Sequence, residues 1–198
     1  MGCLLLCIAV IDMRVRPRVT RFLEPIGKGL SSLGVTPTFM TSFGLVIVIT
    51  GSILIANGFL RSGAIVVLCG AILDGLDGSV ARAGGTESPR GAFLDAAFDR
   101  IGEIAAFAGL GVANAGDERV LLLLVLAMGG AMLVPYLRAK AEAEGFTGNG
   151  GLMGRAERVL IFTIGLMFGV VEPMLWVLVI SVWLTAVMRF VDTYRSFE

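Results

Sequence analysis

The sequence predicts an all-α, polytopic membrane protein with six transmembrane helices and an N-terminal amphipathic helix at the membrane surface. Hydrophobic residues occupy 56% of the 198 positions and charged residues only 16%, against roughly 45–50% and 25% in ordinary soluble domains. Uncharged stretches recur along the chain, and six spans of about 20 residues would use about 120 mostly apolar positions. Lysine and arginine are confined almost entirely to one side of these stretches, as is typical of membrane proteins.

Composition also excludes several kinds of chemistry. The formal net charge is zero, so the protein is not expected to bind nucleic acid through bulk electrostatic attraction. The chain contains no histidine, which excludes a serine–histidine–aspartate triad and histidine-ligated zinc or haem. Cys3, Cys7 and Cys69 have neither a metal-binding nor a redox spacing. Acid–base chemistry is therefore left to carboxylates, lysine, tyrosine or cysteine.

Residues 1–35 are predicted to form a tail and a juxtamembrane helix, and residues 36–198 a single membrane domain. In residues 14–35, apolar side chains such as Val19 and Phe22 recur every three or four positions, with basic side chains on the opposite face. A helix with this pattern lies in the membrane interface rather than across the bilayer.

Residues 36–60 form the first predicted span, because no charge interrupts these 25 positions. At about 1.5 Å per residue they can cross a hydrocarbon core of about 30 Å. Pro37 lies in the first turn, where a helix tolerates proline, and Thr36 is the expected N-cap. Two further spans follow at about residues 62–80 and 91–114. They differ from the first span because each contains carboxylates.

Residues 120–137, 159–171 and 173–188 are the predicted fourth, fifth and sixth spans, since none of them contains a charge. We expect the last two spans to be joined by a tight turn at Glu172–Pro173. A glycine-rich loop, residues 145–154, precedes the fifth span and is expected to be flexible.

The distribution of basic residues predicts the orientation in the membrane. Of the 16 lysine and arginine residues, only Arg61 and Arg119 lie on one side of the predicted spans. By the positive-inside rule, the side with the other 14 is cytoplasmic. Both termini and the loop between the second and third spans are therefore expected in the cytoplasm, with the protein in the plasma membrane.

Four aspartates lie near that loop. Asp74 and Asp77 are three residues apart and Asp95 and Asp99 are four apart, so each pair is expected on one face of its helix. The two helices run in opposite directions. Counting about 1.5 Å per residue from the loop places Asp77 and Asp95 at similar depths, with the other two one turn deeper. All four side chains are therefore expected to face one another.

Four like charges in a low-dielectric pocket would repel one another or become protonated unless a cation neutralised them. One divalent ion, or two about 3.5–4 Å apart, would supply that charge. Since the nearby ligands are all oxygen, Mg²⁺, Mn²⁺ or Ca²⁺ is favoured over zinc or copper. Gly75, Gly78 and Gly91 allow backbone or ligand to approach closely, and Arg82 can reach phosphate oxygens.

Residues 74–99 resemble the signature of the CDP-alcohol phosphatidyltransferase family, DxxDGxxAR followed after eight residues by GxxxDxxxD. Every fixed position is filled and the spacer has the usual length. Family members also often carry Pro-(Asn/Asp)-x-x-Thr at the first span; Pro37 and Thr41 match this motif, whereas Thr38 replaces the acid or amide. The signature residues are Asp74, Asp77, Gly78, Ala81, Arg82, Gly91, Asp95 and Asp99.

This resemblance implies a homodimer of six-span subunits that catalyses a metal-dependent transfer. An acceptor hydroxyl would attack the β-phosphorus of CDP-diacylglycerol or CDP-archaeol and release CMP. The metal site, with Mg²⁺ or Mn²⁺ and two ions, would be formed by Asp74, Asp77, Asp95 and Asp99, with Asp99 as general base. The implied nucleotide-binding residues are Gly78, Ala81, Arg82, Gly91, Asp74, Asp77, Pro37, Thr41 and Ser88.

A second group of basic residues marks the cytoplasmic ends of the last three spans. Converging cations suit an acceptor that itself carries phosphate. The strings RAKAE at 138–142 and RAER at 155–158 resemble the phosphatidylinositol phosphate synthase and archaetidylinositol phosphate synthase branch, which uses inositol 1-phosphate. The residues expected to hold the acceptor phosphate are Arg138, Lys140, Arg155, Arg158 and Arg189.

Other acceptors and two other classes of protein stay open at this point. Glycerol 3-phosphate is the main alternative acceptor, followed by serine or myo-inositol. A cation transporter could use the aspartates as an ion path, although transporters place such groups near the midplane with access from both sides. A membrane prenyltransferase resembles a longer chain with two widely separated aspartate motifs, whereas Asp77 and Asp95 are only 18 positions apart.

Overall fold

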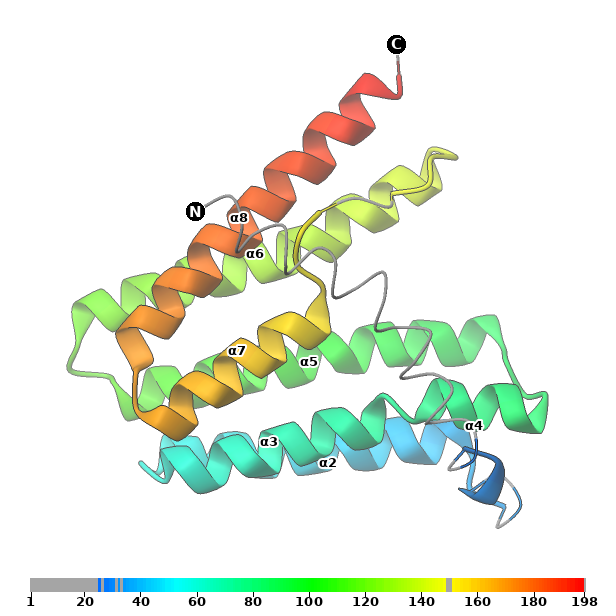
Figure 1. The fold of residues 1–198 in the computed structure, drawn as a ribbon, viewed down its shortest axis with the longest axis horizontal. Coiled ribbons are helices and arrows are strands. Elements are labelled where there is room, and N and C mark those ends of the chain that lie inside the picture. Colours follow the sequence, from blue (N-terminus) through cyan, green and yellow to red (C-terminus); the bar gives the residue numbers. More distant parts are fainter. Residues whose placement is uncertain (1–24, 26, 31, 33, 149–150, 198) are drawn as a thin grey trace. The chain divides into compact units, whose positions relative to one another are not determined.

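The structure is a computed structural model that describes residues 25, 27–30, 32, 34–148 and 151–197. All regular elements within these residues are α-helices (Figure 1), as the sequence predicts. The amphipathic helix predicted for residues 14–35 lies mostly outside the described residues. From residue 37 onward the helices are α2 (Pro37–Ala56), α3 (Leu60–Asp74), α4 (Asp77–Gly84), α5 (Pro89–Ala113), α6 (Glu118–Ala143), α7 (Arg155–Phe168) and α8 (Val171–Arg195).

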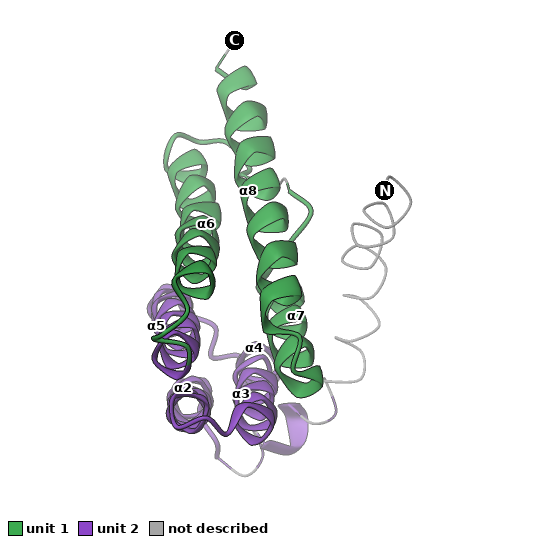
Figure 2. Ribbon diagram, turned by 90° about the vertical axis from the view of Figure 1, so that its left-hand side faces the viewer, with its two compact units in different colours: residues 1–8, 114–198 green, residues 9–113 purple. Residues whose placement is uncertain are grey.

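The helices divide into two compact units, which Figure 2 shows in different colours. The first unit in the sequence, purple and labelled unit 2 in Figure 2, lies within residues 9–113 and contains α2 to α5. The second, green and labelled unit 1, lies mainly within residues 114–198 and contains α6 to α8. In the first unit, α2 packs against α3, α4 and α5. In the second unit, α8 packs against both α6 and α7.

Four stretches of the described chain are long and apolar enough to cross a membrane: Pro37–Ala56, Leu60–Gly84, Glu118–Ala143 and Val171–Arg195. They correspond to the predicted first, second, fourth and sixth spans. Helix α5 has 25 residues, but its first half carries several charged side chains. Helix α7 has 14 residues, about 21 Å of helix, which is short of a core of about 30 Å. The third and fifth spans therefore stay predictions.

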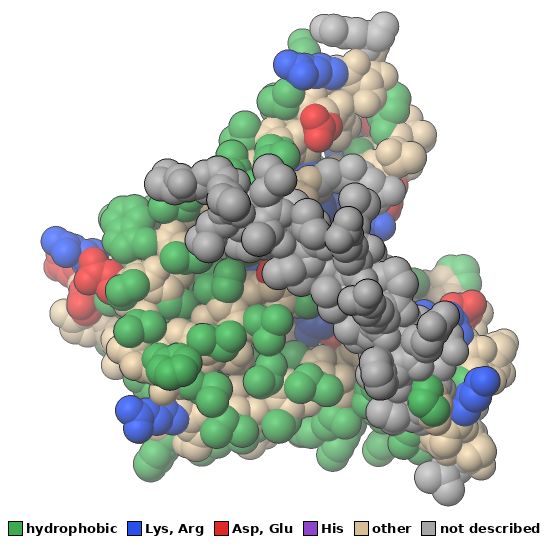
Figure 3. Space-filling view, in the orientation of Figure 1, with side chains coloured by type: hydrophobic (Ala, Val, Ile, Leu, Met, Phe, Trp, Pro, Cys, Tyr) green, Lys and Arg blue, Asp and Glu red, His purple; other side chains and the backbone are tan. Residues whose placement is uncertain are grey.

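Large hydrophobic side chains face outward from these helices. More than half of the surface of Phe39, Leu122 and Ile180 is exposed, and hydrophobic side chains cover much of the face seen in Figure 3. Extended apolar surface of this kind is typical of a site of membrane contact. The protein surface therefore agrees with the membrane class that the composition predicts.

Helix α2 begins as predicted. The side-chain oxygen of Thr36, its N-cap, accepts a hydrogen bond from the Phe39 N–H at 3.2 Å. Pro37 occupies the first turn, where its missing N–H has no intrahelical acceptor to lose. The start of the first span is therefore determined by local chemistry.

The second predicted span is present, but it is not one uninterrupted helix. Helix α3 ends at Asp74, Gly75 and Leu76 form a turn, and α4 begins at Asp77. The Leu76 N–H bonds the carbonyl of Leu73, only three residues back, at 3.2 Å. Glycine weakens a helix interior because it loses more backbone entropy on folding than any other residue. Asp74 and Asp77 therefore lie at the end of one helix and the start of the next, rather than within one uninterrupted helix as predicted.

The turn that joins the last two helices also differs from the prediction. It lies at Gly169–Val170, between the end of α7 and the start of α8, rather than at Glu172–Pro173. Gly169 has a φ of +72°, a left-handed conformation that glycine adopts without steric cost. Pro173 lies in the first turn of α8, where a helix tolerates proline.

Paired glycines bring α2 close to α3. A Cβ atom added to Gly44 would lie 3.0 Å from the carbonyl oxygen of Gly70, and one added to Gly51 would lie 2.9 Å from that of Gly63. Such contacts are too close for a larger side chain. Small residues at helix interfaces let membrane helices pack backbone against backbone, and this packing sets the spacing between α2 and α3.

Helix α5 also packs closely on α2. A Cβ atom on Gly109 would lie 2.4 Å from the carbonyl oxygen of Ser52, and one on Gly102 would lie 3.3 Å from Val48 Cγ1. Both glycines are buried. Helix α2 therefore contacts two helices at once through positions that exclude larger side chains.

In the second unit, α8 packs closely against α6. A Cβ atom on Gly130 would lie 2.4 Å from Val182 Cγ2. The Trp183 indole N–H donates a hydrogen bond to the Leu126 carbonyl at 3.1 Å, which satisfies a polar group that would be costly to leave unpaired in lipid. These contacts connect the middle of α8 to the middle of α6.

Replacing Gly109 by alanine should destabilise the first unit, because the added methyl group would overlap the Ser52 backbone. Overpacking of this kind costs about 1–3 kcal/mol, and thermal unfolding of the purified protein in detergent should show a lower midpoint. Gly129→Ala is the matched control, since nothing lies within 4 Å of its added Cβ; its midpoint should be unchanged or higher. Equal midpoints for the two variants would contradict close packing of α5 on α2.

Candidate functional site

Three aspartates from two helices come together in the first unit. One carboxylate oxygen from each of Asp74, Asp95 and Asp99 lies within 4.8 Å of the other two. Asp74 ends α3 and is 4% exposed, while Asp95 and Asp99 lie one turn apart on α5 and are partly buried. The structure therefore brings together three of the four aspartates that the sequence places on either side of the loop.

The spacing of these oxygens suits a divalent cation. Mg²⁺ binds oxygen at about 2.0–2.1 Å and Ca²⁺ at about 2.3–2.6 Å, so oxygens that share one ion lie no more than about 4–5 Å apart. Three carboxylates this close repel one another unless positive charge is added. A donor set made only of carboxylate oxygen favours Mg²⁺, Mn²⁺ or Ca²⁺. The residues present therefore fit a hard divalent ion.

Arg100 supplies part of the positive charge beside this group. Its Nη2 lies 3.4 Å from Asp99 Oδ2, and its Nη1 lies 4.0 Å from Glu103 Oε2. The Glu103 side chain is only 7% exposed, so the second contact is sheltered from water. One guanidinium placed against two carboxylates carries a single charge, which favours a bound cation over ion pairing alone.

Asp77, the fourth aspartate, is not in this group and contacts α2 instead. Its Oδ2 accepts a hydrogen bond from the Thr41 hydroxyl at 2.7 Å, and its Oδ1 accepts one from the Gly78 N–H. Thr41 is 2% exposed, so the contact is buried. Thr41 and Asp77 are 36 residues apart, and no local spacing could have predicted that they meet.

The signature glycine and arginine of α4 lie against each other. A Cβ atom on Gly78 would lie 3.3 Å from Arg82 Nη1, so the absence of a side chain lets the guanidinium lie along the helix. Arg82 Nη2 also donates to Ser79 Oγ at 3.3 Å. Ala81 is partly buried and Arg82 is exposed, which leaves the guanidinium accessible to an anion.

Ser88 and Gly91 interact at the start of α5. Ser88 Oγ accepts a hydrogen bond from the Gly91 N–H at 3.1 Å, and the Ser88 carbonyl accepts one from the Ala92 N–H at 3.1 Å. This is the pattern of a helix N-cap, and Pro89 occupies the first turn as helices prefer. Ser88 therefore shapes the helix start beside the signature residue Gly91.

Two of the predicted acceptor-binding residues on α6 contact carboxylates four residues later, on α6 and at its C-cap. Arg138 Nε donates to Glu142 Oε1 at 2.8 Å, and Lys140 Nζ pairs with Glu144. The hydrogen bond from Lys140, and then its charge, lower the pKa of the Glu144 carboxyl. All four side chains are 42–60% exposed, so water screens both pairs. The glutamates were not predicted site residues, although helical spacing of four could have indicated them.

Arg158 and Arg189 lie deeper in the second unit. Arg158 on α7 is 3% exposed, and Arg189 Nη1 donates to the Val134 carbonyl of α6 at 2.9 Å. The charges of Arg138 and Arg158 act on Arg189, as does that of Glu142 in the opposite sense. Guanidinium groups from α6, α7 and α8 therefore converge, which favours binding of an anion. Arg155, at the start of α7, is partly buried.

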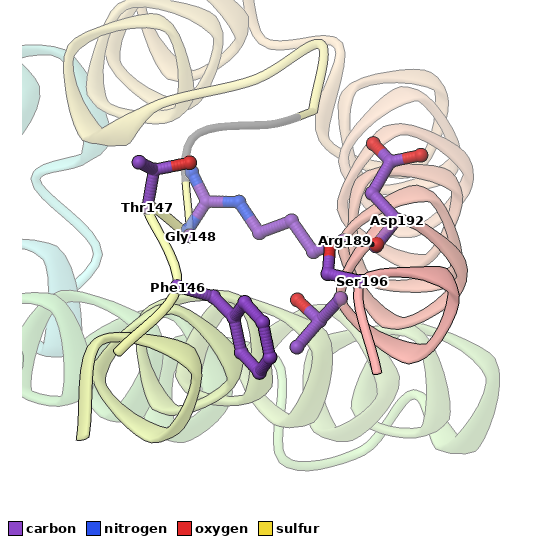
Figure 4. Close-up of a pocket in the computed structure, with 7 residues that line it drawn as sticks. Phe146, Thr147, Gly148, Arg189, Asp192 and Ser196 are labelled. Carbon is purple, nitrogen blue, oxygen red and sulfur yellow. Dashed lines mark hydrogen bonds between the residues drawn. The ribbon is translucent and has the colours of Figure 1, made fainter. Parts of the chain in front are cut away.

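A polar pocket lies beside Arg189 (Figure 4). The Arg189 side chain extends from α8 toward Thr147 and Gly148 in this view. The walls of the pocket combine a cation, a carboxylate and several hydroxyl groups, which suits a polar ligand. The other lining residues are Phe146, Asp192, Thr193 and Ser196.

Glycines of the loop between α6 and α7 pack on two of these arginines. A Cβ atom on Gly148 would lie 3.0 Å from the Arg138 carbonyl oxygen, and one on Gly151 would lie 3.3 Å from Arg189 Nε. Both glycines have positive φ values, +52° and +106°, which other residues rarely adopt. The glycine content of this loop predicts flexibility. At these two positions, glycine also lets the loop pack closely against Arg138 and Arg189.

Comparison with known proteins shows similarity along most of the chain. An archaetidylinositol phosphate synthase of Pyrococcus horikoshii is 34% identical over 188 residues, which cover 93% of this chain and 97% of that protein. A crystal structure of Mycobacterium tuberculosis phosphatidylinositol phosphate synthase with CDP-DAG bound has a TM-score of 0.80 and 30% identity, covering 88% of this chain and 94% of that chain. A second, in complex with manganese and citrate, has a TM-score of 0.79 and 32% identity, covering 87% and 88%.

The family itself is identified from the sequence. The sequence model described as CDP-alcohol phosphatidyltransferase matches residues 34–191, which include the four aspartates and the whole signature. The relatives named above carry names from the inositol phosphate branch that the sequence resembles. The resemblance seen in residues 74–99 is therefore confirmed, and the chain belongs to the CDP-alcohol phosphatidyltransferase family.

Proposed function

We propose that the protein transfers a phosphatidyl-type group from a CDP-linked lipid to the hydroxyl of inositol 1-phosphate and releases CMP. The observation that carries this proposal is the group formed by Asp74, Asp95 and Asp99, three signature aspartates within 4.8 Å of one another. The names of the relatives support the acceptor. The donor is CDP-diacylglycerol or CDP-archaeol, and CDP-DAG in the crystal structure of the mycobacterial relative supports this class of lipid.

The cofactor in this proposal is Mg²⁺ or Mn²⁺, with two ions held by Asp74, Asp77, Asp95 and Asp99. Asp74, Asp95 and Asp99 fit one ion by their spacing, and Asp77 would complete the set. Manganese in the crystal structure of the relative supports the choice of metal. When bound, the ions neutralise the pyrophosphate and stabilise the departing CMP.

The proposed CDP-binding surface follows α4 and the start of α5. Because Gly78 and Gly91 have no side chain, the nucleotide can approach their backbone closely. The exposed Arg82 guanidinium is suited to phosphate oxygens, because its planar fork matches their geometry. The full proposed set is Gly78, Ala81, Arg82, Gly91, Asp74, Asp77, Pro37, Thr41 and Ser88.

Asp99 acts as the general base in the proposed reaction. The acceptor hydroxyl oxygen attacks the β-phosphorus, its proton passes to a carboxylate oxygen of Asp99, and the bond between the β-phosphorus and the oxygen of CMP breaks. Arg100, 3.4 Å from Asp99, orients the carboxylate. Catalysis of phosphoryl transfer depends mostly on positioning and on neutralising charge, which agrees with a site built of carboxylates and arginines.

The acceptor phosphate is held in this proposal by basic side chains of α6, α7 and α8. The convergence of charge on Arg189 supports this role. Arg138 would exchange its exposed contact with Glu142 for the phosphate, which forms stronger, charge-assisted hydrogen bonds with arginine. The proposed acceptor residues are Arg138, Lys140, Arg155, Arg158 and Arg189.

The protein is a membrane protein, given its four long apolar helices and its family. We propose that α5 and α7 supply the third and fifth of six spans in a domain of residues 36–198, which follows a tail and amphipathic helix in residues 1–35. The distribution of basic residues supports a plasma-membrane orientation with both termini and the active site in the cytoplasm. The subunits are proposed to form a homodimer.

The proposed reaction is tested by CMP release. Purified protein with a CDP-linked lipid and Mg²⁺ should release CMP fastest with inositol 1-phosphate, and much more slowly with glycerol 3-phosphate, myo-inositol or serine at the same concentration. Asp99→Asn should lose turnover but still bind CDP. Faster release with glycerol 3-phosphate would overturn the proposed acceptor, and release with none of the alcohols would overturn the function.

The metal site is tested without any substrate. Asp74→Asn should strongly reduce Mn²⁺ binding, measured from the electron paramagnetic resonance signal of free Mn²⁺, because it removes charge from the buried ligand of the three-carboxylate group. Glu118→Gln, an exposed acid at the start of α6, is the control and should bind Mn²⁺ like the parent protein. Equal binding by both variants would refute the metal site.

The acceptor site is tested by a kinetic comparison. Arg155→Ala should raise the KM for inositol 1-phosphate by about tenfold or more, since a hydrogen bond to a charged group contributes about 1.5–3 kcal/mol, and should change the KM for the CDP-lipid little. Arg195→Ala, an exposed residue at the end of α8, should change neither constant. An equal rise in both constants for Arg155→Ala would argue against an acceptor-phosphate role.

A further inference from the structure

The break between α3 and α4 raises the question of what positions Asp77. In a continuous helix, Asp74 would determine where Asp77 lies, because residues three apart share a face. Here the turn at Gly75 and Leu76 separates the two aspartates. Their relative position is therefore no longer set by the geometry of one regular helix, and a contact from a neighbouring helix can help to hold it.

That contact comes from one face of α2. A Cβ atom on Gly44 would lie 3.0 Å from the Cβ of Asp74, so the α2 backbone lies directly against that aspartate. Thr41, one turn earlier on the same face, donates its hydroxyl hydrogen to Asp77 Oδ2 at 2.7 Å. A single helix thus contacts both aspartates across the break.

The Thr41 hydroxyl has two acceptors within reach but only one hydrogen to donate. The Pro37 carbonyl lies at 3.0 Å and Asp77 Oδ2 at 2.7 Å. A carboxylate is the stronger acceptor because it is charged, and it is also the nearer one. The hydroxyl is therefore directed to Asp77, at a site where Thr41 is 2% exposed and water competes little.

These hydrogen bonds are compatible with a metal at Asp77. A carboxylate has about four acceptor positions, and the bonds from Thr41 and from the Gly78 N–H use different oxygens. Together they restrict rotation of the carboxylate plane. Hydrogen bonds of this kind orient metal ligands, and their removal typically costs about 10–100-fold in metal affinity or activity.

We propose that Thr41 is a positioning residue for the metal centre: its buried hydroxyl holds the Asp77 carboxylate in place across the break between α3 and α4. This inference rests on the metal centre of the proposed function. It gives Thr41 a role that does not require nucleotide, in addition to the nucleotide contact that the family motif implies. Removal of the hydroxyl should therefore weaken metal binding even when no CDP-lipid is present.

The test compares variants of the full-length protein for Mn²⁺ binding in the absence of nucleotide. Thr41→Val, which keeps the shape and removes the hydroxyl, should raise the Kd for Mn²⁺ by about tenfold or more. Thr41→Ser, which keeps the hydroxyl, should bind within about twofold of the parent protein. Thr163→Val is the matched control, since Thr163 is also fully buried in a helix and donates only to backbone carbonyls.

A double-mutant cycle shows whether Thr41 acts through Asp77. Thr41→Val should weaken Mn²⁺ binding in the parent protein and have no further effect when Asp77 is already replaced by asparagine. An equal additional loss in the Asp77→Asn background would overturn the inference. So would parent-like Mn²⁺ affinity of Thr41→Val together with a raised KM for the CDP-lipid, which would leave Thr41 as a nucleotide contact alone.

The same experiment separates failure of this inference from failure of the proposed function. Asp74→Asn should lose Mn²⁺ binding whatever Thr41 does; if it binds Mn²⁺ normally, the metal centre itself is refuted. Should Thr41→Val not fold, the comparison of Thr41→Ser with Thr41→Ala gives the same contrast between a present and an absent hydroxyl. Equal Mn²⁺ affinities for that pair would overturn the positioning role.

Discussion

The close contact between α2 and α3 is the constraint on which the first unit depends. Gly44 and Gly51 of α2 pack against Gly70 and Gly63 of α3 at distances that leave no space for a side chain. In a membrane the hydrophobic effect does little to hold helices together, so association depends on such close packing and on hydrogen bonds. The same face of α2 reaches the aspartates at the end of α3 and the start of α4. Packing and site geometry therefore have a common origin.

The second constraint is electrostatic. The gathering of Asp74, Asp95 and Asp99 concentrates negative charge in a partly buried site, which is costly unless positive charge or protonation compensates for it. Arg100 provides some of this charge. In the second unit the converse holds, because the positive charges of Arg138, Arg158 and Arg189 outnumber the one Glu142 carboxylate that acts on Arg189 and favour an anionic ligand. Each unit thus carries a charge cluster that favours binding of a ligand of the opposite charge.

Much of the site could be predicted because the relevant residues are close in sequence. The pairs Asp74–Asp77 and Asp95–Asp99 lie within 26 positions, and the family signature includes them all. The break at Gly75 and Leu76 was missed because a hydropathy pattern continues across a one-turn interruption without change. The turn before α8 was missed because proline was taken as the residue at the turn, whereas proline is tolerated inside the first turn of a helix and Gly169 supplies the left-handed conformation.

By itself, the sequence determined that this is an all-helical membrane protein, which residues carry the acidic signature and which family the chain belongs to. These properties are local or additive: apolar runs, charge counts and short spacings persist whatever the tertiary arrangement. Only the tertiary structure decided that Asp77 lies outside the three-carboxylate group and against Thr41, a residue 36 positions earlier. That contact depends on how closely two helices approach, and the approach is set by glycines whose partners lie on another helix.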